Sequence, residues 1–282
     1  MKISVVSYSL SSQPSGLKEW KEDLCNEIKS FISNGSEVIL YPELFLMGLS
    51  DYFKAGPKEQ LAKISTYIEK DLLPSLESIL IGHNILLVLG TGPRFFNENY
   101  YNSAPLWIDG RWIFQDKLHL TPWEKEFIPG NSIQLISFKG LKTAVIICFD
   151  IEQPGLTLKL KEQGVHFVLV PSATINKNGN QRVNRCASAR SVELGAAVLT
   201  VPLVGDSACD LVDHNEGRQA LFLPPQEIVQ CQQEIFSDYS ISKQVIAYYF
   251  VDEELLVKIK VADDETKPYL TKDNSKIEII KL

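Results

Sequence analysis

The chain of 282 residues has no run of about 18 consecutive apolar residues, the length that a membrane-spanning helix needs. Its N-terminus, MKISVVSYSLSS, lacks the apolar core of a signal peptide, because its apolar residues alternate with serines as in a β-strand. Acidic residues outnumber basic ones and the formal net charge is -7, whereas phosphate-rich partners bind clustered lysine and arginine. We therefore expect a cytoplasmic protein that binds neither nucleic acid nor membranes.

Metal-binding patterns are missing as well. The cysteines are an odd number without a CxxC pair, which fits neither a disulfide framework nor a zinc ribbon. The histidines lack ligand spacing such as HExxH. We predict reduced thiols, no metal and no cofactor. The thiols belong to Cys25, Cys148, Cys186, Cys209 and Cys231.

The apolar residues that are present recur in strand and helix patterns. A strand over 2–8, an amphipathic helix over 17–32 and a buried strand over 38–40 predict the beginning of a parallel sheet. Two strands flank Asp109-Gly110, a dipeptide that favours a tight hairpin turn. Further strands are expected near 84–90, 133–138, 142–147, 166–171, 196–202, 218–223 and 244–251, and further helices near 57–82, 154–163, 180–194 and 252–258.

No internal repeat, low-complexity tract or flexible linker divides the sequence, so we predict a single domain over residues 1–282. Helices alternate with many strands, and some of the strands form antiparallel hairpins. This alternation indicates two sheets packed together with helices outside them, an α/β fold.

Reactive side chains stand at the ends of three predicted strands. Glu43 ends VILYPE, Lys117 ends RWIFQDK and Cys148 ends TAVIIC, and such positions face a crevice in open α/β folds. Each has a simpler explanation when taken alone, because a buried cysteine is commonly a small apolar residue and charged residues such as Glu124 are commonly solvated. Together they supply the nucleophile, the base, the oxyanion-binding cation and the proton donor that amide cleavage requires.

The segments around these residues resemble the nitrilase superfamily of carbon-nitrogen hydrolases. Members carry a strand that ends in Pro-Glu, then a Lys-x-His-Leu segment and a Cys-Tyr-Asp segment, in that order. The matching stretches here are YPEL at 41–44, DKLHL at 116–120, WEKEFIPGN at 123–131, CFDIEQPG at 148–155 and RCASARSVELG at 185–195. The resemblance covers most of residues 1 to about 225.

This resemblance implies a four-layer α-β-β-α sandwich with a Glu-Lys-Cys triad. Glu43 matches the general base, Lys117 the oxyanion stabiliser and Cys148 the nucleophile. Glu124 matches a second glutamate that orients the lysine or shares proton transfer. The backbone N–H of Phe149 is expected to be the second oxyanion donor.

The resemblance also implies a substrate pocket, although the family pattern is not matched everywhere. Gln153 and Gly155 replace the usual Phe and Glu, and Leu194 replaces a usual Asn. None of these is a matched catalytic position. Because of these differences, the substrate of one branch of the family is not assigned to this chain. The candidate substrate-binding residues are Tyr52, Tyr101, Asn102 and Thr174.

We predict that the substrate is a small linear amide, with a nitrile or an N-carbamoyl compound as the alternative. A Cys-His pair formed with His119 is a less favoured mechanism, and this histidine is better interpreted as a structural hydrogen-bonding residue. An alternative of another class is a catalytically silent interaction subunit. The resemblance further implies a homodimer or higher homo-oligomer, formed through the helices near 154–163 and 180–194, with a C-terminal tail from about 260 in the dimer contacts.

Overall fold

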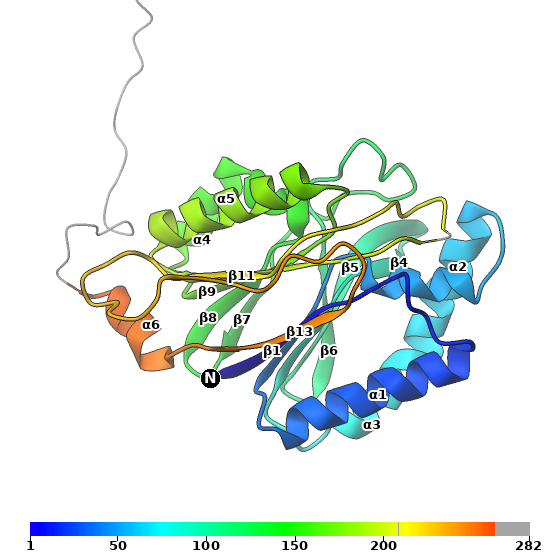
Figure 1. Ribbon diagram of the computed structural model, residues 1–282, viewed down its shortest axis with the longest axis horizontal. Coiled ribbons are helices and arrows are strands. Elements are labelled where there is room, and N and C mark those ends of the chain that lie inside the picture. The colour runs from blue at the N-terminus through cyan, green and yellow to red at the C-terminus, as the bar shows by residue number, and fades with distance from the viewer. Residues whose placement is uncertain (208, 263–282) are drawn as a thin grey trace, which may run out of the picture.

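The computed structural model describes residues 1–207 and 209–262. Within these residues two β-sheets pack face to face, and helices cover the outer side of each sheet (Figure 1). The first sheet has the strand order β13-β1-β2-β3-β5-β4, with β6 paired to β5, and the second has the order β12-β11-β10-β9-β8-β7. The predicted four-layer α-β-β-α sandwich is confirmed.

The strands of the first sheet are β1 (Lys2–Ser7), β2 (Val38–Tyr41), β3 (Leu86–Leu89), β4 (Gly92–Phe96), β5 (Asn99–Ile108), β6 (Arg111–Asp116) and β13 (Val245–Phe250). The strands of the second are β7 (Leu135–Phe138), β8 (Leu141–Val145), β9 (Phe167–Ser172), β10 (Ala197–Pro202), β11 (Ala220–Phe222) and β12 (Glu234–Phe236). All of the predicted strands are present, with ends that differ from the expected ones by a few residues.

The helices fall into two outer layers (Figure 1). The first sheet is covered by α1 (Leu17–Ser33), α2 (Pro57–Tyr67) and α3 (Leu73–Leu80), and the second by α4 (Pro154–Glu162) and α5 (Lys177–Leu194). Helix α6 (Glu253–Ile259) lies near the N-terminus, where the Met1 ammonium pairs with Glu253 at 2.8 Å. The remaining helical turns are η1 (Phe45–Asp51), η2 (Ile68–Leu72) and η3 (Cys148–Glu152). No helix in the described part of the chain is long and apolar enough to cross a membrane.

Strand β2 contributes side chains to two different hydrophobic cores. Val38 and Leu40 belong to the core between the two sheets, whereas Ile39 and Tyr41 belong to the core between the first sheet and its helices. Neighbouring residues of a strand point to opposite faces, and both faces are buried here. The uninterrupted apolar run VILY is therefore typical of this central strand.

The predicted helix over 57–82 is divided. A π-helical turn, η2, joins α2 to α3, and Pro74 follows it at the start of α3. Proline has no backbone N–H, and its ring collides with the carbonyl of the preceding turn in a regular helix. The wider π-turn accommodates this residue within a continuous helical segment.

Strand β4 was not predicted, because its sequence GPRFF begins with glycine and proline. Proline cannot donate to a ladder and is tolerated on edge strands, and β4 is the last strand of its sheet. The predicted C-terminal tail lies outside the described residues from 263 onward.

Gly90, which follows β3, holds the segment after β2 in place. Its φ is +61°, and a Cβ atom there would lie 2.2 Å from the carbonyl oxygen of Pro42 and 2.7 Å from Cβ of Phe45. Thr91 then donates its N–H to Pro42 (3.2 Å) and accepts the N–H of Leu44 on Oγ1 (2.8 Å). The close approach of the two segments fixes the backbone on either side of Glu43.

We expect Gly90→Ala to lower the free energy of unfolding much more than Gly82→Ala. Both glycines have positive φ, but nothing lies within 4 Å of a Cβ at Gly82, where φ is +85°. The control should cost about 1–2 kcal/mol for its backbone alone, and overpacking at Gly90 should add about 1–3 kcal/mol. Urea unfolding of the two variants measures the difference, and equal losses would refute the steric role of Gly90.

Candidate active site

Glu43 links the two sheets at the end of β2. Its side chain is only 2% exposed. Oε1 accepts hydrogen bonds from Nζ of Lys117 (2.7 Å) and Nδ2 of Asn102 (3.0 Å). Oε2 accepts the backbone N–H of Ala173 (2.9 Å), the residue that follows β9 in the second sheet. The carboxylate is thus held from both sides of the sandwich.

Lys117 follows β6 directly, and its side chain is 2% exposed. Its ammonium lies 2.7 Å from Glu43 and 2.7 Å from Oε2 of Glu124. Glu124 also accepts the backbone N–H and the hydroxyl of Thr121 (2.8 Å each). Asn102 donates to Oε1 of Glu124 (2.9 Å) as well as to Glu43, so one amide bridges the two carboxylates. One cation and two anions therefore share a buried network.

The three charges of this network shift one another's pKa values. Burial alone would lower the pKa of Lys117, but the charges of Glu43 and Glu124 raise it well above its ordinary value. Burial raises the pKa of Glu43, and the Lys117 ammonium offsets only part of this effect. Burial acts on Glu124 as well, yet Lys117 and the N–H of Thr121 lower its pKa. Lys117 and Glu124 remain charged, while Glu43 is the carboxylate with the greater affinity for a proton.

Cys148 lies at the sharp turn that follows β8. Its φ is +46°, a left-handed conformation that non-glycine residues rarely adopt and that marks local strain. Its Sγ lies 3.6 Å from the carbonyl oxygen of Ala173. Burial, and then the charge of Glu43, raise the pKa of the thiol. Phe149 stands in the first turn of η3, where backbone N–H groups have no partner within the helix.

Asp150 ties the cysteine turn to the segment after the lysine. Its carboxylate accepts the backbone N–H groups of Leu118 (3.1 Å) and His119 (2.7 Å) and also lies 2.8 Å from Nδ1 of His119. His119 is therefore a structural hydrogen-bonding residue, as interpreted from the sequence. The contact fixes the backbone next to Lys117 relative to the turn at Cys148.

Asn102 and Tyr101, both candidates for substrate binding, point to opposite faces of β5. Asn102 is fully buried in the network with the two glutamates. Tyr101 pairs with Arg94 across β4 and β5, and the Arg94 guanidinium lies 5.6 Å from its ring. The structure thus brings Asn102 to the charged cluster and places Tyr101 on the outer side of the sheet.

The other two candidates lie in loops. The hydroxyl of Tyr52 donates to the carbonyl of Pro14 (2.7 Å). Thr174 is buried next to Ala173, and its hydroxyl donates to the carbonyl of Glu216 (3.1 Å). Thr174 is therefore the sequence neighbour of Ala173, which binds Glu43 of the cluster. Tyr52 is instead hydrogen-bonded to the loop after β1.

Sequence analysis did not identify three groups that complete the site: Thr121, Asp150 and the backbone of Ala173. Thr121 and Glu124 have the spacing of a capping box, a signal that could have indicated their mutual hydrogen bond. Asp150 is part of the CFD segment. No side-chain pattern marks the N–H of Ala173. Among the described residues no group of three His, Cys, Asp or Glu side chains is arranged to hold a metal ion.

Comparison with known proteins gives a consistent result. A structure of the Nesterenkonia AN1 amidase from the nitrilase superfamily, a mutant form, superposes with a TM-score of 0.69 at 19% identity, over 92% of this chain and 93% of that chain. The probable hydrolase YhcX of Bacillus subtilis is 27% identical over 61% of this chain and 35% of its own length. An (R)-stereoselective amidase of Pseudomonas sp is 25% identical over 61% of each chain. The matched region thus spans about a third and about three fifths of these two relatives.

The family comparison covers a larger part of the chain. The profile described as carbon-nitrogen hydrolase matches residues 3–225, which include every residue of the charged cluster and the cysteine turn. The resemblance to the nitrilase superfamily is confirmed, and the chain belongs to the carbon-nitrogen hydrolase family.

Proposed function

We propose that the protein is an amidase-like hydrolase that cleaves the carbon-nitrogen bond of a small linear amide through a thioester on Cys148. One observation carries this proposal: the thiol, the Glu43 carboxylate and the Lys117 ammonium are gathered in one buried site. The backbone of Ala173 touches both reacting groups, since its N–H binds Glu43 and its carbonyl oxygen lies near the thiol. Such an arrangement fits acyl transfer to a cysteine.

Acylation begins with proton transfer. Sγ of Cys148 attacks the amide carbon while Glu43 takes the thiol proton, so a carbon-sulfur bond forms and the carbonyl electrons move to oxygen. The resulting oxyanion is stabilised by the Lys117 ammonium and the N–H of Phe149. When the tetrahedral intermediate collapses, the carbon-nitrogen bond breaks and Glu43 returns the proton to the departing amine or ammonia.

Deacylation repeats these steps with water. Glu43 takes a proton from the water that attacks the thioester carbon, and the carbon-sulfur bond then breaks. The thiolate regains the proton from Glu43, and a carboxylic acid is released. The overall reaction converts one amide and one water to a carboxylic acid and an amine or ammonia.

The pKa shifts match these roles. The raised pKa of Cys148 keeps the resting thiol protonated, so the reaction needs a base at the moment of attack. The raised pKa of Glu43 makes it a stronger base than an ordinary glutamate. The raised pKa of Lys117 excludes it as a base and keeps it as a cation. Glu124, whose pKa is lowered, stays an anion and orients the Lys117 ammonium.

Relatives support an amide as the substrate class. The Nesterenkonia AN1 amidase is known in mutant forms in complex with butyramide and with acrylamide added at its active site cysteine. The relative from Pseudomonas sp is also an amidase. Nitriles and N-carbamoyl compounds, which the same residues could attack, are the alternative substrates that the assay must compare.

We expect the protein to release ammonia from small linear amides faster than from nitriles or N-carbamoyl compounds in an enzyme-coupled ammonia assay. Cys148→Ala and Cys148→Ser should abolish release while circular dichroism stays unchanged, because neither side chain supplies a thiolate. Turnover by either variant near the wild-type rate would refute the thioester mechanism. A folded wild-type protein that acts on no class of substrate would favour the silent interaction subunit.

Substitutions of the three charged residues should differ in severity. Glu43→Gln should remove nearly all acylation, and Lys117→Met should slow it about 100- to 1000-fold, while Glu124→Gln should be mildest. Because Glu43 must be ionised and its pKa is raised, kcat/KM should fall with decreasing pH at a pKa above that of an ordinary glutamate. Single-turnover measurements of acyl-enzyme formation test this order. If Glu124→Gln blocked acylation as completely as Glu43→Gln, the two carboxylates would share the proton.

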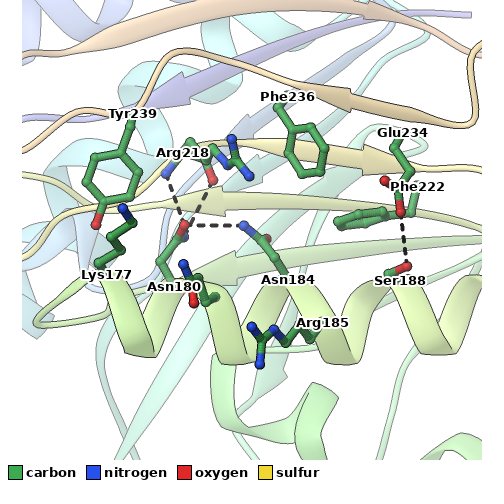
Figure 2. A pocket seen from close by; sticks show the side chains of 11 residues that line it. Lys177, Asn180, Asn184, Arg185, Ser188, Arg218, Phe222, Glu234, Phe236 and Tyr239 are labelled. Carbon is green, nitrogen blue, oxygen red and sulfur yellow. Dashed lines mark hydrogen bonds between the residues drawn. The ribbon is translucent and has the colours of Figure 1, made fainter.

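The proposed homodimer would use the outer faces of α4 and α5. Leu158 on α4 and Val192 on α5 are exposed apolar residues, 62% and 40% respectively. A groove of about 590 Å³ lies between α5 and strands β11 and β12 (Figure 2). Its charged lining residues are Lys177, Arg185, Arg218 and Glu234. Since cations outnumber carboxylates here, a second copy covering the groove must bring acidic side chains, which a chain of net charge -7 has in excess.

We expect light scattering at micromolar concentration to give at least twice the mass of the 31.7 kDa chain. Leu158→Glu should shift the mass toward the monomer, because it places charge at an apolar contact. Ile81→Glu, an equally exposed apolar position (60%) at the end of α3 on the opposite outer layer, is the matched control and should leave the mass unchanged. A wild-type protein that is only monomeric would contradict the proposed assembly.

A further inference from the structure

A second cavity lies directly behind the charged cluster, across the first sheet. Side chains alternate along β5, so Asn102 points to the cluster and Ser103 points to the outer face. On that outer face, under α2 and η2, a cavity of about 290 Å³ opens next to Ser103. Its lining residues include Leu46, Ser65, Ile68, Gly92, Arg94 and Phe114. We call it the outer cavity.

The walls of the outer cavity belong to the segments that carry the proposed catalytic residues. Leu46 lies three residues after Glu43 along the chain, and Ser103 directly follows Asn102. The guanidinium of Arg94 pairs with Asp116 at 2.9 Å, and Asp116 directly precedes Lys117 in the sequence. A molecule in this cavity would therefore contact the backbone supports of the charged cluster without entering it.

Two polar groups at the outer cavity lack partners. The hydroxyl of Ser103, a residue that is 2% exposed, and Nε of Arg94 are buried with no hydrogen-bond partner within the described residues. An unsatisfied buried donor costs about 1–3 kcal/mol. Each of the two groups can donate to an acceptor atom. Because Asp116 already balances the charge of Arg94, that acceptor need not be an anion.

Apart from Ser65 and Glu69, the other lining residues are apolar. Ile68 and Leu73 come from the helical segment, and Phe114 comes from β6. Phe96, also a lining residue, contacts the Arg94 guanidinium and is 50% exposed, so a large apolar side chain meets solvent at the cavity. The π-turn η2, a form of helix that often marks functional sites, contributes Ile68 to the wall. Apolar walls with a few polar groups are typical of small-molecule sites.

We propose that the outer cavity binds a small, neutral, largely apolar molecule whose carbonyl or hydroxyl oxygen accepts a hydrogen bond from the Ser103 hydroxyl. The walls of this site belong to the segments that hold Asn102 and Lys117, so the bound molecule would lie next to the charged cluster without entering it. The binding step is independent of the proposed hydrolase activity, because it involves neither the thiol nor turnover.

Benzyl alcohol is a suitable probe, since it combines an apolar ring with one hydroxyl. Titration of the full chain, followed by backbone amide shifts in NMR spectra, should give saturable changes at Gly92, Phe95 and Ser103. Cys148→Ala should bind the probe as the wild type does. This control separates the outer cavity from the proposed active site.

Two substitutions test the walls of the cavity. Ser103→Ala should weaken binding about 2- to 10-fold, the equivalent of one hydrogen bond, while leaving the free energy of unfolding equal or higher, because it removes an unpartnered hydroxyl. Ser65→Leu, which projects from α2 into the cavity and also removes the acceptor of the Phe95 N–H, should abolish binding. Ser78→Leu, on the exposed side of α3, is the matched control and should bind normally.

The outcomes are distinguishable. Shifts confined to the residues around Cys148 and Ala173, or unchanged affinity in Ser103→Ala, would overturn the proposal. Shifts that depend on protein concentration instead of probe concentration would show that Phe95 and Phe96 meet a second copy, and would also overturn it. If Ser65→Leu failed to fold, Ser103→Ala alone would decide. None of these results depends on whether the protein hydrolyses amides.

Discussion

The buried ammonium of Lys117 is the constraint on which the site depends. Removing a charge from water costs several kcal/mol unless opposite charges and hydrogen bonds compensate it, and truncating one member of such a buried group costs about 3–5 kcal/mol. Glu43 and Glu124 supply the compensation at 2.7 Å each. They in turn need Lys117, because two carboxylates without a cation between them could not both stay ionised. The segments that carry these residues must therefore converge, and they come from β2, β6 and the loop after β6.

The cysteine turn is joined to this network by backbone groups. Ala173, after β9, donates its N–H to Glu43, and Asp150 accepts two N–H groups from the segment after Lys117. Both contacts cross between the sheets, so neither sheet could build the site alone. The left-handed conformation of Cys148 is maintained inside this frame, which is how a fold keeps a locally strained residue at a functional position.

Much of this arrangement could be predicted from sequence, because it rests on local patterns. Uninterrupted apolar runs such as VILY indicate strands buried on both faces, and Glu43, Lys117 and Cys148 stand where those strands end. Contacts made by backbone atoms could not be predicted, since any residue type can supply the N–H of Ala173. The faces of β5 were also ambiguous: Asn102 and Tyr101 are adjacent, and only the register with β4 shows which of them points inward. Pro93 concealed an edge strand, because proline reads as a chain breaker.

The two backbone contacts of Ala173 restrict which substitutions the core between the sheets can tolerate. Ala173 meets the carboxylate of Glu43 with one atom and the thiol of Cys148 with another, and it belongs to the second sheet while Glu43 belongs to the first. In the proposed mechanism, the distance over which the thiol proton travels is therefore set by the spacing of the two sheets. Apolar residues between the sheets, such as Val88 and Leu169, set this spacing, so their volume would bear on the rate of the proposed reaction as well as on stability. A substitution in this core can leave the protein stable and still place the Cys148 thiol too far from the Glu43 carboxylate for the proposed proton transfer. The proposed reaction at the edge of the core would therefore restrict the sequence of the core.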